Sequence, residues 1–290
     1  MKHIDPSDPK RVEAMVRGAL EEDGAGGDVT SAFVGLGERT ADGTIDVSAP
    51  VTLCGIDVAR EVFRRVDAAC TFEALRHDGH HAAAGDAVCR LHGRAASILA
   101  AERTALNFLQ RMSGVATMAS RFVEAVHGTG AVILDTRKTI PLWRELDKYA
   151  VRCGGAQNHR RALDTMVLVK DNHVRVLGGP ERLIEAIAGR KHEGQFVEVE
   201  VDSIDFLRAL LKVRVDRIML DNFTPAQVAE AMERVREFRA AHTVRRLEIE
   251  VSGGITLENV RDYAQPGVDF ISVGAITHSV PAAPMSLSVQ

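Results

Sequence analysis

Six short apolar runs separated by helix-like segments occupy the second half of the chain, and they constrain the fold more than any other feature. The runs lie at 131–134, 166–169, 196–201, 217–220, 247–251 and 269–273. Amphipathic helices are predicted among them at 181–190, 204–212, 225–240 and 257–264. Strands that alternate with helices form βα units, which assemble into a parallel sheet. The pattern therefore predicts an α/β fold and leaves open the choice between a barrel and a doubly wound sheet.

The first 114 residues show a different pattern, which predicts a mixed α+β domain. Helical spacing covers 12–22 and 58–66, whereas strand-like patterns cover 43–51, 72–75 and 87–91. The last two strands flank a turn at Asp78-Gly79, and three histidines surround that turn: His77, His80 and His81. Metal ligands need support from rigid elements, so exposed hairpin histidines are favoured here over a metal site.

A long helix is predicted from 102 to about 127, and one of its faces is unusual. The spacing places Arg103, Asn107, Gln110 and Gly114 together, away from the apolar face. This polar stripe lacks the mixed lysines and glutamates of an ordinary solvated surface. The pattern alone leaves a solvated face and a contact face equally open.

Composition excludes several classes of protein. The formal net charge of −4 argues against a general nucleic-acid binder, which would carry a basic stripe. The apolar runs are far shorter than the roughly 20 residues that span a bilayer, so no membrane association is predicted. The four cysteines are widely spaced without a C-x-x-C pair, which predicts free thiols. Because residues 1–10 also lack the apolar core of a signal peptide, we expect a cytoplasmic protein.

The ends of the predicted strands are charged or rich in glycine. In chain order they carry Asp135-Thr136-Arg137-Lys138, Lys170-Asp171-Asn172-His173, Glu198 and Glu200 (inside the third strand), Asp221-Asn222, Ser252-Gly253-Gly254 and Gly274-Ala275. Active sites of α/β folds form at this end of the sheet, and loops after the final strands commonly bind phosphate. Any one of these residues is more often a cap or a solvated loop residue. Together they suit a substrate that carries carboxylates or phosphates, with a divalent metal.

Two glutamates of the third strand, Glu198 and Glu200, share one face because side chains alternate along a strand. Burying both without partners would cost several kcal/mol each. We therefore expect at least one of them to meet a cation, a metal or strong hydrogen-bond donors.

At these residues the chain resembles the quinolinate phosphoribosyltransferase family. The matching stretches are EEDGAGGDVTS (21–31), GIDVAREVF (55–63), AERTALNFLQRMSGVAT (101–117), LDTRKTIPLWRELDKYAVRCGGAQNHR (134–160), LVKDNH (168–173), VEVEV (197–201), MLDN (219–222), EVSGGI (250–255) and ISVGAITHS (271–279). The combination of TRKT, NHR, KDNH and SGGI is highly specific. Departures are small: Ala156 replaces a frequent glycine, and Leu142-Trp143 stands where a glycine or small residue is common.

The resemblance implies both a fold and an activity. The fold is an open α/β barrel of seven parallel strands at 115–275, with an N-terminal α+β sandwich domain at 1–114 that 276–290 joins. Only six strands are visible in the sequence. The implied enzyme transfers phosphoribosyl from phosphoribosyl pyrophosphate to quinolinate with decarboxylation, using Mg²⁺, and yields nicotinate mononucleotide for NAD biosynthesis. The family also implies a homodimer, and whether dimers associate further stays open.

The resemblance also assigns roles to residues. It implies that Arg137, His159, Arg160 and Lys170 bind quinolinate, with Thr136 in the substrate site and Lys138 near the reacting centre. Glu200 and Asp221 would hold Mg²⁺ and the ribose and, with Lys138, act in catalysis. Ser252, Gly253, Gly254, Val273, Gly274 and Ala275 would surround the 5′-phosphate. Arg103 would enter the active site of the partner subunit.

Two other functions remain to be weighed. One is a phosphoribosyltransferase of the same fold with another acceptor, such as the relative associated with molybdate transport. The other is a non-catalytic protein that binds an anionic metabolite, since a fold does not determine a function. The full set of cations favours a dicarboxylate acceptor. Retention of Glu200 and Asp221 argues against simple anion capture, which gains nothing from added negative charge.

Overall fold

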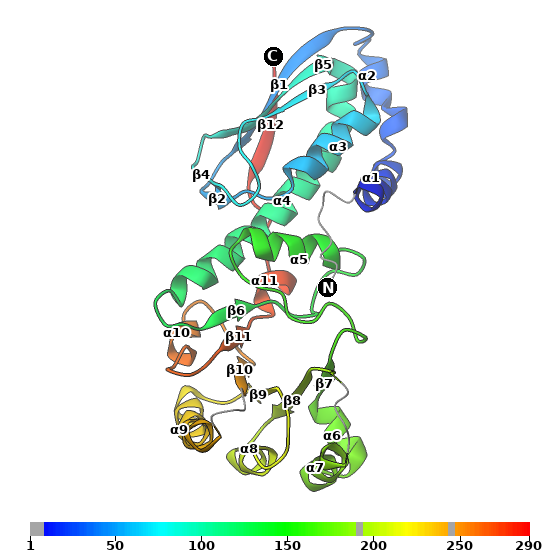
Figure 1. Cartoon of the computed structure of the whole chain (residues 1–290). Coiled ribbons are helices and arrows are strands. Elements are labelled where there is room, and N and C mark those ends of the chain that lie inside the picture. Colours follow the sequence, from blue (N-terminus) through cyan, green and yellow to red (C-terminus); the bar gives the residue numbers. More distant parts are fainter. Residues whose placement is uncertain (1–8, 190–193, 243–246) are drawn as a thin grey trace. The chain divides into compact units, whose positions relative to one another are not determined.

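The computed structural model describes residues 9–189, 194–242 and 247–290, and the chain divides into two compact units. The first unit comprises the residues up to 120 together with 140–155 and 279–290. The second unit comprises 121–139 and 156–278. Each unit has its own sheet (Figure 1).

The first unit is built on a four-stranded antiparallel sheet. Its order is β12 (Met285–Val289), β1 (Thr40–Val47), β5 (Ala87–Arg94) and β3 (Thr71–Ala74). A separate pair joins β2 (Val51–Thr52) to β4 (His81–Ala82). The helices are α1 (Pro9–Asp23), a 3₁₀ turn (Ala25–Gly27), α2 (Val29–Phe33), α3 (Ile56–Val66), α4 (Ala95–Ala125, in this unit as far as Ser120) and α5 (Arg144–Cys153).

Alternation and spacing explain these elements. In β1 the side chains of Ile45 and Val47 are buried, as expected for a strand with one face on the core. In α3 the residues Val58, Val62 and Phe63 form the buried face, and two arginines occupy the last turn, where cations favour a helix end. The predicted helices at 12–22 and 58–66 are confirmed as α1 and α3.

The second unit contains a six-stranded parallel sheet. Its order is β6 (Val132–Leu134), β11 (Phe270–Ser272), β10 (Glu248–Ser252), β9 (Arg217–Asp221), β8 (Val197–Val201) and β7 (Val167–Val169). All six predicted strands are therefore confirmed, and so is the predicted α/β fold class with a parallel sheet and a separate antiparallel sheet.

The parallel sheet has six strands among the described residues, and a single further bridge extends its β6 edge. Gln157 forms an isolated parallel bridge with Leu134 on the free edge of β6. Its N–H donates to Ile133 O at 2.9 Å, and its carbonyl accepts from Asp135 N at 3.1 Å. Gln157 follows β6 and precedes β7 in the chain, as a strand in this position would. The bridge is too short to form a periodic apolar run, so the sequence pattern could not reveal it.

Helices follow the strands of the second unit and pack side by side along the sheet (Figure 1). They are α6 (Asp171–Leu177), α7 (Pro180–Ala188), α8 (Ile204–Leu210), α9 (Pro225–Ala241), α10 (Val260–Tyr263) and α11 (Ala275–His278). The predicted helix at 257–264 is shorter than expected. The side chain of Asn259 accepts the Thr256 N–H at 2.8 Å in a turn, and the helix begins only at Val260.

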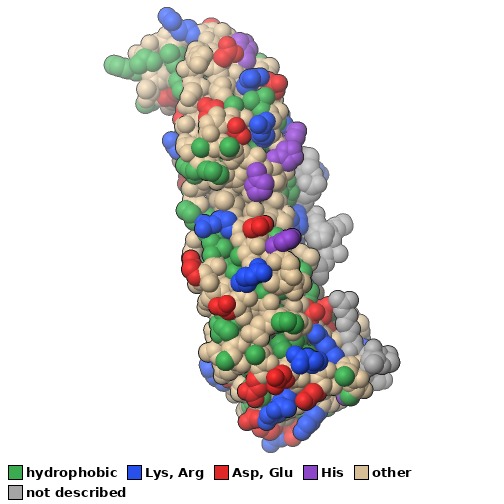
Figure 2. Space-filling model, turned by 90° about the vertical axis from the view of Figure 1, so that its left-hand side faces the viewer, with side chains coloured by type: hydrophobic (Ala, Val, Ile, Leu, Met, Phe, Trp, Pro, Cys, Tyr) green, Lys and Arg blue, Asp and Glu red, His purple; other side chains and the backbone are tan. Residues whose placement is uncertain are grey.

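Several composition-based predictions can be compared with the described residues. All four cysteines are free, and His77, His80 and His81 are exposed, as predicted. Within the described ranges, each helix is either too short or too polar to cross a bilayer. Acidic and basic side chains are interspersed on the face drawn in Figure 2, which shows no continuous basic stripe.

Candidate functional site

Most of the predicted site residues of the second unit meet in one pocket at the carboxyl ends of the strands. The pocket is lined by Thr136, Arg137, Lys138, His159, Arg160, Leu168, Lys170, Asp171, Glu200, Met219, Asp221, Asn222, Ser252, Gly253, Gly254 and Ser272. Among the predicted residues, Arg103 and Val273–Ala275 do not line it. The structure therefore places residues from several distant strand ends around one pocket.

Two carboxylates and two lysines form the acidic side of the pocket. Glu200 in β8 is 8% exposed and forms an ion pair with the Lys170 ammonium group. Burial raises the pKa of Asp221, and the negative charge of Glu200 raises it further, whereas Lys170 and Lys138 lower it. Asp221 therefore lies near enough to Glu200 for the two carboxylates to repel one another, a conflict that a cation relieves.

His159 lies on a buried pair of carboxylates beneath the pocket. Its Nε2 lies 3.2 Å from Glu198 Oε2 and 3.4 Å from Glu250 Oε2, and its Nδ1 accepts the Arg160 N–H at 2.7 Å. Burial lowers the pKa of His159, but the two carboxylates outweigh burial and raise it to about 9. A proton on Nε2 faces the two carboxylates, and this interaction is what raises the pKa of the ring.

Arg217 supplies a second positive charge to the buried carboxylates of Glu198 and Glu250. Its Nη1 donates to Glu250 Oε2 at 2.9 Å and lies 3.8 Å from Glu198 Oε2. The remaining oxygen of Glu250 accepts from the Ser272 hydroxyl. Glu198 and Glu250 are both fully buried, so the expectation that the third strand would need a cation is confirmed.

Asp135 fixes the segment that carries His159 and Arg160. Its Oδ2 accepts from Asn158 Nδ2 and its Oδ1 accepts from His159 N, both at 2.8 Å. Asp135 is fully buried directly after β6. A buried carboxylate that accepts two hydrogen bonds from one short loop holds that loop in a single position.

Asp135, Arg217 and Glu250 were not among the predicted site residues. A signal for Glu250 was present, because Glu248-Ile249-Glu250 repeats the alternation of Glu198-Val199-Glu200. The pairing of Arg217 with residues 198 and 250 depends on strand register, which the sequence does not contain.

The glycine-rich turns have different roles. A side chain at Gly253, where φ is +98°, would meet Asn222 Oδ1 at 2.2 Å, so the turn after β10 requires glycine. Gly254 has open space around its Cα and is exposed. A Cβ at Gly274 would lie 3.1 Å from Lys138 Cδ, which places this glycine against the lysine stem. The Val273 side chain is fully buried, so only its backbone could face a ligand.

Arg103 belongs to the first unit and is exposed on α4. It has no hydrogen bond or ion pair with the described residues. The polar face predicted around it divides in two. Asn107 is exposed, whereas Gln110 Nε2 donates to Met285 O at 2.9 Å and a Cβ at Gly114 would lie 2.4 Å from Pro281 O. The chain's own C-terminal segment therefore covers the second half of this face.

The structure shows the conformation of Leu142-Trp143, which stands where a glycine or small residue is common in the family that the chain resembles. Leu142 is 92% exposed and has φ of +67°, a left-handed conformation that costs a non-glycine residue roughly 1–2 kcal/mol. This conformation explains why a glycine would suit the position. Trp143 stacks on Phe108, with ring centroids 4.9 Å apart.

Comparison with known proteins gives consistent matches over nearly the whole chain. The sequence model described as "Quinolinate phosphoribosyl transferase, C-terminal domain" matches 115–288, and the N-terminal domain model of the same family matches 28–113. A probable nicotinate-nucleotide pyrophosphorylase [carboxylating] from Methanocaldococcus jannaschii is 39% identical, with 95% of this chain and 96% of that protein covered.

Two further relatives agree. The nicotinate-nucleotide pyrophosphorylase [carboxylating] of Mycobacterium leprae is 40% identical, with 91% of this chain and 92% of that protein covered. The solved structure of the nicotinate-nucleotide pyrophosphorylase from Francisella tularensis superposes with a TM-score of 0.89 at 37% identity, covering 99% of this chain and 98% of that chain.

Proposed function

The chain belongs to the quinolinate phosphoribosyltransferase family, and from this membership we propose that it transfers phosphoribosyl from phosphoribosyl pyrophosphate to quinolinate. The products are nicotinate mononucleotide, carbon dioxide and pyrophosphate, which places the enzyme in NAD biosynthesis. The observation that carries the proposal is the pocket that brings cations from three loops together with Glu200 and Asp221.

The cationic side of the pocket suits an acceptor with two carboxylates. Arg160 is 7% exposed, and burial lowers its pKa, with a further decrease caused by the positive charge of Arg137. A dianion placed between these guanidinium groups removes their repulsion and accepts charge-assisted hydrogen bonds. We assign Arg137, His159, Arg160 and Lys170 to quinolinate binding, with Thr136 beside them.

Glu200 and Asp221 fit a Mg²⁺ ion. Magnesium binds one or two carboxylates together with substrate phosphates. The pKa of Asp221 is raised mainly by burial and further by the negative charge of Glu200, and a bound cation would offset both effects. When bound, the ion would neutralise the pyrophosphate that leaves ribose C1.

The reaction exchanges bonds at two carbons. The ring nitrogen of quinolinate forms a bond to ribose C1 as the bond from C1 to pyrophosphate breaks. Glu200 and Asp221 stabilise the positive charge that develops at C1, and Lys138 lies beside the reacting groups. The ring nitrogen then bears a positive charge, so the C2–carboxylate bond breaks with its electron pair drawn into the ring, and C2 takes up a proton.

Backbone N–H groups are assigned to the 5′-phosphate. Gly254 offers open space, and the turn of Ser252, Gly253 and Gly254 exposes N–H groups of the kind that bind anions. The backbone of Val273, Gly274 and Ala275 completes this part of the proposed site. Much of the rate enhancement would come from positioning two anionic substrates that repel one another in water.

The active enzyme is assigned as a homodimer in which Arg103 reaches the partner's quinolinate. In support, Arg103 is an exposed cation on a face with few charge pairs. Large apolar side chains are exposed on the same unit: Leu99 is 40% exposed one turn before Arg103, and on α2 Phe33 is 91% and Val29 79% exposed. An exposed apolar surface beside an unused cation is typical of a subunit interface.

One assay tests the function directly. Purified protein is incubated with phosphoribosyl pyrophosphate, Mg²⁺ and quinolinate labelled in the C2 carboxylate, and both carbon dioxide and pyrophosphate are measured. We expect equal amounts of the two products, with little pyrophosphate when nicotinate replaces quinolinate. Turnover of another acceptor in preference to quinolinate would indicate the alternative phosphoribosyltransferase of the same fold. Binding of quinolinate without turnover would indicate the non-catalytic binding protein.

A further inference from the structure

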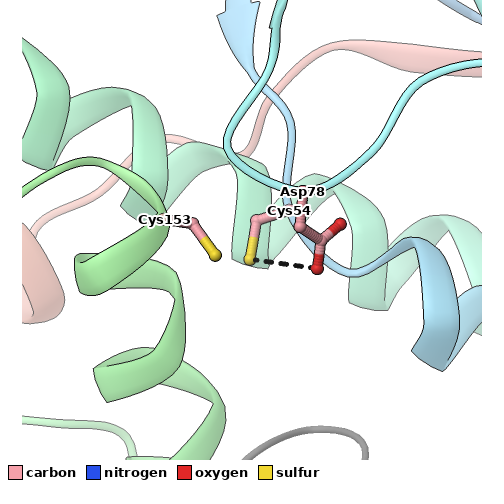
Figure 3. Close-up of side chains that lie close together, drawn as sticks. All are labelled: Cys54, Asp78 and Cys153. Carbon is pink, nitrogen blue, oxygen red and sulfur yellow. Dashed lines mark hydrogen bonds between the residues drawn. The ribbon is translucent and has the colours of Figure 1, made fainter.

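Two cysteines that are remote in the sequence converge with a carboxylate in the first unit. Cys54 follows β2, Asp78 lies in the turn after β3, and Cys153 ends α5 (Figure 3). The two sulfur atoms and one Asp78 oxygen all lie within 4.8 Å of one another. In Figure 3 the Cys153 sulfur points toward the Cys54 sulfur, and the Asp78 carboxylate closes the other side.

The spacing matches the coordination sphere of one metal ion. Zinc binds thiolate sulfur at about 2.3 Å and carboxylate oxygen at about 2.0–2.2 Å, so two ligand atoms of one ion lie at most about 4.6 Å apart. Cys54 Sγ and Asp78 Oδ2 are separated by 3.9 Å. A covalent bond between the two sulfurs would instead need about 2.05 Å. Both cysteines are free in the structure, and the 3.9 Å separation falls within the range that one shared ion allows.

Hydrogen bonds already hold these groups in place. Asp78 Oδ1 accepts from Gly55 N at 2.9 Å and from Ile56 N at 3.0 Å, which leaves Oδ2 directed at the sulfur atoms. Ser113 Oγ accepts from Cys54 N and donates to Cys54 O. Such outer contacts are what orient the ligands in metal sites.

We propose that Cys54, Asp78 and Cys153 bind a thiophilic divalent cation of the zinc class. Two sulfur ligands and one oxygen select zinc over magnesium or calcium, which prefer oxygen alone. Cys54 is buried, whereas Asp78 and Cys153 are half-exposed, so the ion can enter from solvent. A water molecule or the Tyr149 hydroxyl, which donates to Asp78 Oδ2 at 3.0 Å, completes four-fold coordination. This site differs in chemistry from the all-oxygen pair of Glu200 and Asp221.

Cobalt titration tests the site without any activity measurement. The full chain is reduced, treated with a chelator and titrated with Co²⁺, and the thiolate-to-cobalt charge-transfer absorption is recorded. We expect one equivalent of Co²⁺ per chain to produce this absorption and Zn²⁺ to abolish it. Cobalt bound by Glu200 and Asp221 would give none, because those ligands are oxygens.

Variants and chemical protection provide the controls. Cys153→Ser should lose the charge-transfer absorption, whereas Cys70→Ser, a half-buried thiol of the same unit, should keep it. In the wild-type chain, Zn²⁺ should slow alkylation of Cys153 at least tenfold and leave Cys70 unchanged, a readout that needs no variant to fold. The proposal is overturned if the wild-type chain shows no charge-transfer absorption, if Cys153→Ser retains it, or if Zn²⁺ does not protect Cys153. A Cys54–Cys153 disulfide as the native state, with no metal uptake after reduction, would also overturn it.

Discussion

Replacing Arg217 by methionine tests whether this arginine stabilises the buried carboxylates of Glu198 and Glu250 beneath the pocket. The guanidinium group bonds Glu248 and Glu250 and stacks 4.0 Å above the Phe270 ring centroid. Methionine keeps the apolar stem and removes the charge and the donors. Glu198 and Glu250, both fully buried, would then lose the guanidinium group that they share, although His159 would still lie beside both.

The size of the effect follows from burial. Removing one partner of a buried ion pair costs about 3–5 kcal/mol, because it leaves an uncompensated charge in the interior. The Arg217 side chain is only 12% exposed, so solvent screening reduces this cost little. For domains of this size 1 kcal/mol changes the melting temperature by about 2–4 °C, so we expect a fall of roughly 6–20 °C.

Thermal unfolding followed by circular dichroism measures this change. Arg208→Met is the matched control, since Arg208 forms a surface pair with Asp205 in which the side chains are 49% and 92% exposed. An exposed pair contributes at most about 1 kcal/mol. Adding Glu250→Gln to Arg217→Met should recover part of the loss by removing one buried charge. The reasoning is refuted if Arg217→Met melts within 2–4 °C of Arg208→Met.

Three further predictions concern the proposed site. Arg160→Ala should weaken quinolinate binding by about 2–4 kcal/mol and leave phosphoribosyl pyrophosphate affinity within a few-fold, and calorimetry showing unchanged quinolinate affinity would contradict it. Asp221→Asn should lower turnover and apparent Mg²⁺ affinity without unfolding, and wild-type activity at limiting Mg²⁺ would make Asp221 structural. Arg103→Ala and Lys138→Ala should each be nearly inactive, yet their mixture should recover roughly a quarter of wild-type activity after subunit exchange, because about half of randomly paired dimers hold one intact site. No recovery despite exchange would remove Arg103 from the partner's site.

The strands of the second unit could be predicted because each is a buried apolar run between turn residues. Helix α5 could not, since charged residues are buried in it together with Leu146, Ala150 and Val151. Glu145, Asp147 and Lys148 are buried there, and Asp147 accepts two hydrogen bonds from Arg111 Nη2, at 3.0 and 3.1 Å. Buried charged residues interrupt the apolar stripe by which an amphipathic helix is recognised in a sequence. Strand β12 could not be predicted either. It is mostly exposed, so it shows no buried apolar run, and it is defined by its pairing with β1.

The candidate site, too, could be predicted only in part from the sequence. Residues at strand ends could be grouped from the sequence, because parallel strands end at one edge of a sheet. Contacts that depend on which strands are neighbours could not be derived, and Arg217 with Glu250 is such a pair. Asp78 shows a third limit. The turn around it was predicted, but its side chain accepts hydrogen bonds from the backbone N–H groups of Gly55 and Ile56, which no local pattern connects to the turn.

The pairing of β12 with β1 affects the order in which the protein can fold during synthesis. β1 lies between β5 and β12, and Gly43 is paired with Val289. The sheet of the first unit is therefore incomplete until residue 289 has left the ribosome, although most of its other residues emerge early. The second unit contains no residue beyond 278 and can complete its sheet sooner. We expect the N-terminal sheet to retain an unpaired strand edge while the rest of the chain is made, an edge that chaperones or neighbouring nascent chains can bind.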